Sequence, residues 1–379
     1  MVNLFVCGDI YNKKVQDGNI CSNELSKIII EADYSVCNFE APVDGCGQPR
    51  PNNPGNPINQ RKETIDGLKS QGFNLLLLAN NHMMDYGADA LTATLEKARK
   101  NGLETLGAGL NSDTIYKHLI KNINGLKLGM INACEAQFGV HDYYKNKKEP
   151  SYAWINHHFI DQAILDLRKK CDFIIIFSHA GLEYYPVPQK EWRERYKHLC
   201  DLGADLVIGS HPHVPQGFER HKGSLIFYSL GNFLFHSKSR KDQRDQSFAL
   251  WLELEKNNPV SFTPVYHFTK DRRVHLAPPE KTIDIEELSS LLRDSYFELH
   301  DKMSIETYNS LRRKLLLCLM PIPFDGNIKS TFSRIKAKII GRSKKIKKEP
   351  LLLHMLRNES YHFAMKHALE LLSKEKYIK

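Results

Sequence analysis

The side chains that could bind a metal ion recur after short apolar runs. Five such runs lie at residues 4–7, 34–38, 75–79, 173–177 and 206–208, and each is followed within three residues by a carboxylate, carboxamide or imidazole group. The residues in question are Asp9, Glu40, Asn81, His82, His179, His211 and, slightly further along, His213. Carboxylate, imidazole and amide ligands without a thiolate suit manganese, iron or zinc. The pattern predicts a metal-binding site.

Each of these residues has a simpler interpretation when it is considered alone. Asp9 could be a turn residue, Glu40 could be a solvated loop acid, and His82 with its neighbours could cap a helix. His211 and His213 are separated by one residue, which places both imidazoles on one side of an extended segment. Because five strand ends carry such residues, one metal site is favoured over separate structural explanations for each residue.

The elements that must position these residues alternate between strand and helix over the first 230 residues. Further strand-like runs lie at 128–132 and 225–228, and apolar residues recur at helical spacing in 88–98 and 159–167. This alternation predicts an α/β fold. Ligands bind at the carboxyl ends of strands in open α/β sheets, which is where the candidate residues lie.

The sequence changes character after a Pro-Pro pair at 278–279. Strands are expected at 248–254 and 260–266, and the following sequence is charged, leucine-rich and of helical spacing. We therefore predict a domain at 1–278 and a helical C-terminal extension at 279–379. The helices are expected at 283–299, 305–319 and 351–372.

Composition places the chain among ordinary globular proteins. Of its 379 residues, 41% are hydrophobic and 26% are charged, which excludes disordered and collagen-like classes. No apolar run approaches the roughly 20 residues that span a bilayer, and the first residues lack signal-peptide character. The eight cysteines show no metal-binding spacing. Reduced thiols and a cytoplasmic location are therefore expected.

One basic segment accounts for the net charge of +9. Residues 329–348 contain nine Lys or Arg residues and no acid. The segment could be a solvated surface, or it could contact a membrane surface or an assembly partner, since apolar residues are interleaved with the basic ones. Peripheral membrane association is the second of these interpretations. No motif that reads nucleotide bases is present, so a sequence-specific nucleic-acid partner is not expected.

The motifs resemble, in their order along the chain, those of the CapA (poly-γ-glutamate capsule synthesis) family. The resemblance covers roughly residues 2–270. The motifs that carry it lie at 8–9 (GD), 38–42 (NFEAP), 78–82 (LANNH), 179–184 (HAGLEY), 203–214 (GADLVIGSHPHV) and 228–233 (YSLGNF). That family is similar in fold to calcineurin-like metallophosphatases. The resemblance thus implies a four-layer α/β/β/α sandwich with a dinuclear metal centre.

The resemblance also implies how the candidate ligands are shared. Asp9 and His213 would hold one ion. Asn81, His179 and His211 would hold the other. The implied chemistry is metal-dependent hydrolysis at a phosphoryl or acyl centre of an anionic polymer or phosphoester.

Three further roles follow from the same resemblance. Glu40 would bridge the two ions, and His82 would face the substrate as a general acid or electrostatic stabiliser, with Asn81 as its catalytic neighbour. The wider phosphatase pattern has Asp-x-His in its first motif, whereas Tyr11 stands at the histidine position here. The bridging acid in that pattern is Asp rather than Glu. A mononuclear centre is therefore the alternative to a dinuclear one.

Four other residues are candidates for binding substrate. Glu183 and Tyr184 follow His179 and could line the cleft, although the tyrosine could equally pack over the sheet edge. Asn232 follows a strand and could contact the site or make a turn. Arg61, beside a Pro- and Gly-rich loop, could meet an anionic substrate or be an ordinary surface residue.

The residues leave more than one class of function open. The first is a metal-dependent hydrolase in capsule or exopolysaccharide biosynthesis. The second is a non-catalytic assembly or polymer-binding component that retains the metallophosphatase fold. A phosphodiesterase acting on nucleotides would rest on fold analogy alone.

Overall fold

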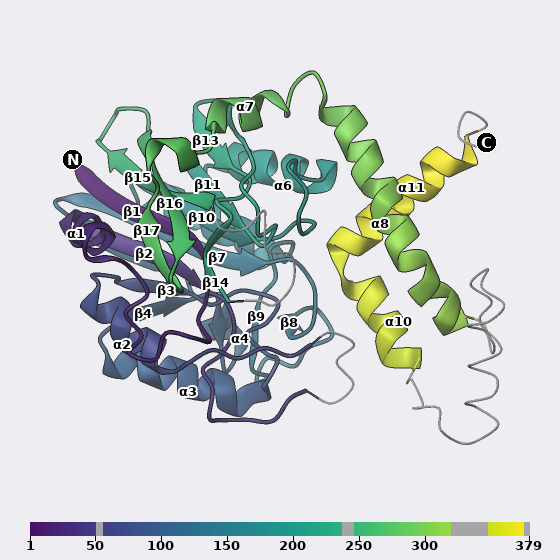
Figure 1. Ribbon diagram of the computed structural model, residues 1–379, viewed down its shortest axis with the longest axis horizontal. Helices are drawn as coiled ribbons and strands as arrows, with labels where there is room; N and C mark the ends of the chain where they lie inside the picture. The colour runs from purple at the N-terminus through teal and green to yellow at the C-terminus, as the bar shows by residue number, and fades with distance from the viewer. Residues whose placement is uncertain (51–55, 237–245, 320–347, 375–379) are drawn as a thin grey trace.

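Two β-sheets packed face to face form the body of the protein (Figure 1). The computed structural model describes residues 1–50, 56–236, 246–319 and 348–374. The first sheet has the order β17 (Arg273–Leu276), β16 (Ser261–Lys270), β15 (Gln246–Leu254), β1 (Val2–Tyr11), β2 (Tyr34–Phe39), β3 (Leu75–Leu77) and β4 (Glu104–Leu106). A further strand, β14 (Asn232–Phe235), pairs with β1 in parallel.

The second sheet is built around parallel strands as well. Its order is β12 (Phe218–His221), β13 (Ser224–Phe227), β11 (Leu206–Ser210), β10 (Phe173–His179), β7 (Leu126–Cys134) and β6 (Leu119–Ile123). A small third sheet joins β5 (Ala108–Gly109), β9 (Ser151–Ala153) and β8 (Val140–His141). In both large sheets the parallel central strands end on the same side, as the sequence pattern requires of a ligand-binding edge.

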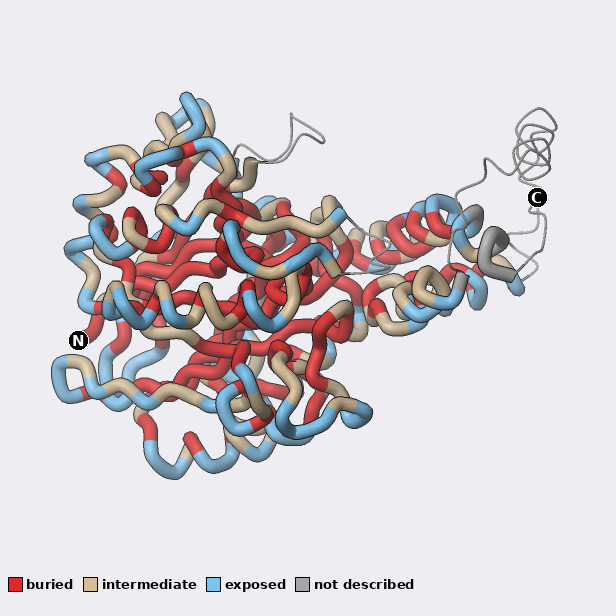
Figure 2. The backbone as a smooth tube through the Cα atoms, turned by 90° about the horizontal axis from the view of Figure 1, so that it is seen from below, coloured by how far each residue is buried: buried red, intermediate tan, exposed pale blue. Residues whose placement is uncertain are grey.

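Helices cover the outer face of each sheet. The first sheet packs against α1 (Asn23–Glu31), α2 (Glu63–Ser70) and α3 (Gly87–Lys100), and the second against α5 (His158–Arg168) and α6 (Lys190–Asp201). A short helix, α4 (Ser112–Ile115), lies beside the third sheet. Buried segments are concentrated in the sheets and the helix faces against them (Figure 2). The predicted α/β/β/α sandwich is confirmed.

The side chains of β1 show why the strands occupy inner layers. Phe5 and Cys7 belong to the apolar cluster beneath the helices, whereas Leu4 and Val6 belong to the cluster between the two sheets. Successive side chains of a strand point to opposite faces, so a strand apolar at every position is buried on both. The continuous apolar runs of the sequence are thus explained by two covered faces.

The chain beyond the sheets is helical. It consists of a 3-10 turn η1 (Pro279–Lys281) and the helices α7 (Ile285–Ser290), α8 (Tyr296–Leu319), α10 (Lys348–Arg357) and α11 (Glu359–Ser373). The boundaries differ from those expected, because α8 continues through residues 300–304 and the last predicted helix is divided in two. The division falls at Asn358, whose side chain accepts a hydrogen bond from the amide of Tyr361 and so begins α11.

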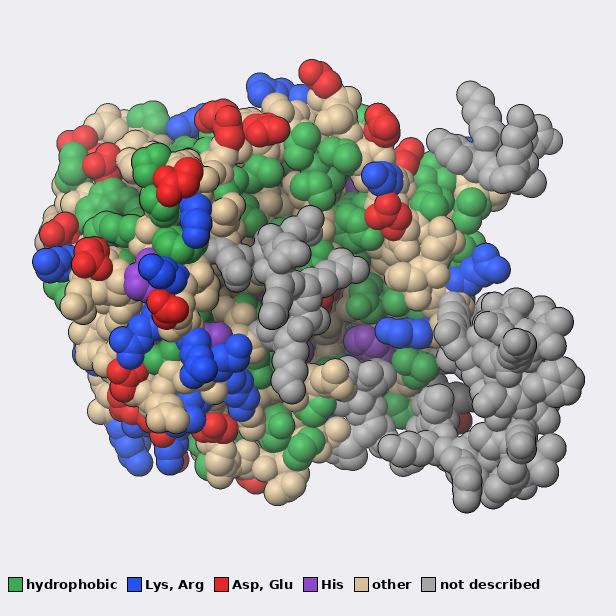
Figure 3. Space-filling model, viewed as in Figure 1, with side chains coloured by type: hydrophobic (Ala, Val, Ile, Leu, Met, Phe, Trp, Pro, Cys, Tyr) green, Lys and Arg blue, Asp and Glu red, His purple; other side chains and the backbone are tan. Residues whose placement is uncertain are grey.

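The basic segment at 329–348 lies outside the described residues except for its last position, where α10 begins. On the described part of the visible face, acidic and basic side chains are interspersed (Figure 3). Among the described helices, none combines the length and the apolar character needed to cross a membrane.

Candidate metal centre

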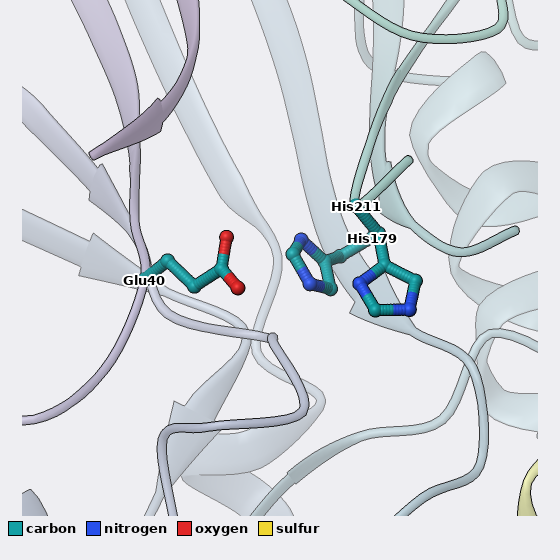
Figure 4. Close-up of side chains that lie close together, drawn as sticks. All are labelled: Glu40, His179 and His211. Atoms are coloured by element: carbon teal, nitrogen blue, oxygen red, sulfur yellow. The ribbon is translucent and has the colours of Figure 1, made fainter. Parts of the chain in front are cut away.

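The carboxyl ends of strands from both large sheets converge on one buried site. Asp9 lies near the end of β1 and Glu40 directly follows β2, while His179 ends β10 and His211 follows β11. All four side chains are buried. Glu40 points from the edge of one sheet toward the imidazoles of His179 and His211 at the edge of the other (Figure 4). The site therefore exists because two sheets face each other.

The backbone around the site is tightly constrained. A Cβ atom at Gly8 would lie 1.9 Å from the carbonyl oxygen of Gly231, so the close approach of β1 to the residue before β14 requires glycine. Ala41, His211 and His213 have φ values of 101°, 96° and 59°, in a region that non-glycine residues seldom occupy. Such conformations persist where the surrounding structure fixes them, and they concentrate at functional sites.

Asp9, Glu40 and His213 form one group of potential ligands. Their donor atoms all lie within 4.8 Å of one another. Nδ1 of His213 lies 3.4 Å from Oδ2 of Asp9, and Nε2 of His213 lies 3.8 Å from Oε1 of Glu40. The structure thus brings together the two residues that the resemblance assigns to one ion and the residue it assigns to the bridge.

Glu40, His179 and His211 form a second group within the same 4.8 Å limit. The ring centroids of the two histidines are 4.6 Å apart, and Oδ1 of Asn81 lies 3.0 Å from Nε2 of His179. Asn81 is therefore adjacent to this group. Glu40 belongs to both groups, which is the arrangement that a bridging carboxylate requires.

Unpaired polar atoms indicate that a cation fits between these groups. Both carboxylate oxygens of Glu40 and Nδ1 of His211 are buried and make no hydrogen bond within the described residues. A buried carboxylate without a partner carries a large desolvation cost. A divalent ion would remove that cost, and the carboxylate, imidazole and amide donors suit manganese, iron or zinc.

The pKa values show how strongly these groups interact. Burial and the nearby Asp9 raise the pKa of Glu40 to about 8, and burial lowers the pKa of His211 to about 4. Burial also opposes protonation of His213, but the charges of Glu40 and Asp9 outweigh it and raise its pKa to about 10. Metal binding requires ionised carboxylates and neutral imidazoles, so an ion would displace the protons that these groups share.

His82 lies at the more accessible side of the centre. Its side chain is 23% exposed, its Nδ1 lies 2.6 Å from Oδ2 of Asp85, and its Nε2 lies 4.0 Å from Oε1 of Glu40. Burial disfavours the imidazolium, yet Asp85 and Glu40 outweigh this effect and raise the pKa of His82. The residue is thus oriented by Asp85 with its second nitrogen facing the centre.

Three of the four predicted substrate-binding residues lie at the centre. Asn232 places Oδ1 2.9 Å from Nδ1 of His213, and the ring of Tyr184 stacks on the same histidine at 5.8 Å. Glu183 forms a further group of potential ligands with His211 and His213. Asn232 therefore orients the candidate ligand His213, and Glu183 is a further candidate ligand.

The other two residues singled out in the sequence are placed differently. Arg61 pairs with Glu63 at 3.2 Å, and no contact with the candidate ligands is found within the described ranges. Tyr11 is buried and packs on Phe235, with ring centroids 5.0 Å apart. Burial raises the pKa of Tyr11 to about 12, so its phenol stays protonated where the wider phosphatase pattern has an imidazole.

Three residues that contact the candidate ligands were not predicted from the sequence. Nδ2 of Asn38 donates to Oδ1 of Asp9 at 2.6 Å. Oε1 of Glu135 lies 3.7 Å from Nε2 of His211, and the side chain of Gln137 contacts the same nitrogen at 3.2 Å. Glu135 lies three residues after the apolar run at 128–132, so the strand-end criterion could have found it. Asn38 gave no such signal, because it lies within a strand.

The chain matches the family model described as "Bacterial capsule synthesis protein PGA_cap" over residues 3–237. It is 32% identical over 217 residues to the capsule biosynthesis protein CapA of Bacillus anthracis, covering 56% of this chain and 52% of that protein. It is 31% identical over 244 residues to the PGA biosynthesis protein CapA of Bacillus subtilis (strain 168), covering 64% of this chain and 63% of that protein. The match thus spans between half and two thirds of these relatives.

Solved structures are more distant. The calcineurin-like phosphoesterase YfkN from Bacillus subtilis superposes with a TM-score of 0.40 and 13% identity, covering 79% of this chain and 98% of that one. A likeness at this level says nothing about function. Inferences about function therefore rest on the family match and on the geometry of the site.

Proposed function

The chain belongs to the family of bacterial capsule synthesis proteins PGA_cap, and on that premise we propose that it is a metal-dependent hydrolase. Its substrate would be an anionic polymer or phosphoester handled during capsule or exopolysaccharide synthesis. The observation that carries this proposal is the buried carboxylate of Glu40. It accepts no hydrogen bond from the part of the chain that the structure describes and lies between two sets of imidazole and carboxylate donors, which is the environment of a metal-bridging ligand.

The residues of the centre would have different roles in hydrolysis. One or two divalent ions, held by the two groups that share Glu40, would supply Lewis-acid polarisation and an activated water molecule. His82 is held by Asp85 through Nδ1, so Nε2 is free to donate a proton to a leaving group or to stabilise developing negative charge. Asn81 would fix His179 through its side-chain oxygen.

The alternative is a polymer-binding component of capsule assembly without catalytic activity. Tyr11 favours it, because a neutral phenol in place of an imidazole leaves the Asp9–His213 group with one ligand fewer than the wider phosphatase pattern. In that case the centre would bind an anionic chain through its ions without cleaving it.

Metal analysis combined with hydrolysis assays tests the proposal. The purified chain should bind one or two manganese ions and hydrolyse a chromogenic phosphodiester or γ-glutamyl anilide. A His211→Ala, His213→Ala double variant should lose both properties. The matched control is His198→Ala, His362→Ala, which removes two histidines that lie on exposed positions.

Two outcomes would contradict the hydrolase proposal, and they lead to different conclusions. If the wild type and the site variant bind equally little metal, the metal centre does not exist. If the wild type binds metal in the expected ratio but cleaves neither class of substrate, the assembly component is the better description.

A further inference from the structure

A cavity of about 640 Å³ lies between the loop that follows β10 and the C-terminal helices. Glu183 and Tyr184 line it from the loop, Thr307, Ser310 and Lys314 line it from α8, and Tyr361 lines it from α11. The three α8 residues are spaced three and four apart, so they share one face of that helix. The volume falls within the roughly 300–1,000 Å³ of sites that bind small molecules.

The cavity adjoins the candidate metal centre. Glu183 lines the cavity and also groups with His211 and His213 as a potential ligand. Tyr184 likewise lines the cavity and stacks on the ring of His213. A molecule held in the cavity would therefore lie next to the ligand residues.

Apolar packing fixes the helical wall of the cavity against the loop. Leu182 from the loop, Met303 from α8 and Ala364 from α11 form one buried cluster. Tyr185 and Tyr361 pack against that cluster, and the hydroxyl of Tyr185 also lies 3.5 Å from the side chain of Thr307. The wall is thus part of the folded body rather than a separate appendage.

Polar contacts at the start of α11 add to this attachment. A carboxylate oxygen of Glu359 accepts hydrogen bonds from the amide of Ala136 at 2.6 Å and from Nε1 of Trp154 at 3.1 Å. The hydroxyl of Ser360 donates to Glu135, whose other oxygen lies near His211. The same helix therefore contacts both the cavity and the residues behind the metal ligands.

We propose that this cavity is a substrate subsite in which α8 binds the chain segment next to the reacting group. The inference rests on the proposed function, and it identifies α8 as the part of the protein that recognises the polymer. Lys314 would pair with a carboxylate or phosphate, and the hydroxyls of Thr307 and Ser310, which donate to Tyr185 and to the carbonyl of Thr307, would accept hydrogen bonds from amide or hydroxyl groups of the same segment. Glu306, also on the wall, would accept an N–H and repel a second anionic group there.

The helical wall of the subsite, formed by α8 and α11, lies beyond the family match, which ends at residue 237, whereas the loop after β10 lies within it. Selectivity for one anionic polymer over another would thus come from the C-terminal helices. The candidate metal ligands, by contrast, lie within the part of the protein that matches the family model.

Binding of a fluorescent oligo-γ-glutamate to the full chain with manganese tests the subsite. Lys314→Ala should raise the Kd about fivefold to tenfold through loss of a charge-assisted hydrogen bond, and Lys314→Glu should raise it further. The matched control is Arg312→Ala, because Arg312 is exposed and lies two positions, about 200°, around the helix. That variant should stay within about twofold of the wild type. Turnover of a small phosphodiester should be the same in all four proteins.

Equal binding by the wild type, the Lys314→Ala variant and the Arg312→Ala variant overturns the subsite, as does a wild type that does not bind the oligomer. If the oligomer binds through Lys314 but nothing is hydrolysed, the hydrolase proposal fails and the subsite stands. If the small phosphodiester is hydrolysed while Lys314 has no effect on binding, the reverse holds.

Discussion

Glu40 is a fully buried carboxylate whose oxygens accept no hydrogen bond from the described residues. In the sequence it is one acid before an Ala-Pro pair, which a solvated loop would explain equally well. The structure removes that explanation, because solvent does not reach the side chain and imidazoles of His179, His211 and His213 from the facing sheet lie beside it. At the scale of single residues, burial is what distinguishes a ligand from a loop acid.

A second buried group away from the centre predicts a pH dependence of stability. His267 on β16 is buried against Phe233, with ring centroids 4.8 Å apart, and burial lowers its pKa to about 3. In the unfolded chain its pKa is about 6.5. Below pH 6.5 His267 is therefore protonated in the unfolded state but stays neutral in the folded state. The free energy of unfolding falls as the pH falls.

Replacing His267 by Phe should remove this contribution. Between pH 7 and pH 5 the wild type should lose about 2 kcal/mol of unfolding free energy more than the His267→Phe variant. Urea unfolding at the two pH values measures this, with His362→Phe at an exposed position as the control. Identical losses in the wild type and the His267→Phe variant would contradict the buried neutral histidine.

At the scale of secondary structure, α11 is attached to the body through its first turn. Ser360 is buried, donates to Glu135 and accepts a hydrogen bond from Nε1 of Trp192 at 2.9 Å. Burial raises the pKa of Glu135 to about 8 even though hydrogen bonds from Ser360, Gln137 and the amide of Gly181 favour its ionised form. The attachment thus depends on polar groups that cannot be solvated if a partner is removed.

Ser360→Ala should lower the unfolding free energy by about 1–3 kcal/mol, because it removes one hydrogen bond from a buried carboxyl and leaves the indole N–H of Trp192 without its acceptor. Ser373→Ala, at the exposed end of the same helix, should change it by less than about 0.5 kcal/mol. Denaturant titrations of the two variants measure the difference. A Ser360→Ala variant as stable as Ser373→Ala would show that α11 is not fixed by this contact.

At the scale of the whole molecule, the candidate ligands come from strands of both sheets, so an ion would join the two halves of the sandwich. An ion that binds the folded chain and not the unfolded one stabilises it by about 2.7 kcal/mol at a hundredfold excess over its Kd. We expect manganese to raise the Tm by a few degrees and a chelator to reverse the rise. The His211→Ala, His213→Ala variant should show no such shift in a thermal scan, whereas an equal shift in that variant would place the ion elsewhere.

Much of the fold could be predicted from the sequence because it depends on local patterns. Continuous apolar runs identified seven of the strands in the two sheets up to residue 228, and their ends identified the ligand candidates. The strands β4, β6 and β12 carried too few consecutive apolar residues to be recognised, and β14, although mostly apolar, is only four residues long. The split between α10 and α11 was missed because one capping asparagine, Asn358, does not interrupt the apolar spacing.

By itself, the sequence determined which residue types stand at the carboxyl ends of the strands, since strand period and strand end are properties of neighbouring residues. The tertiary structure alone decided that Glu40 from one sheet meets His179 and His211 from the other, that Arg61 pairs elsewhere, and that the C-terminal helices form a wall beside the site. These are contacts between residues far apart in the chain. They follow from how whole layers pack on one another, which no local spacing encodes.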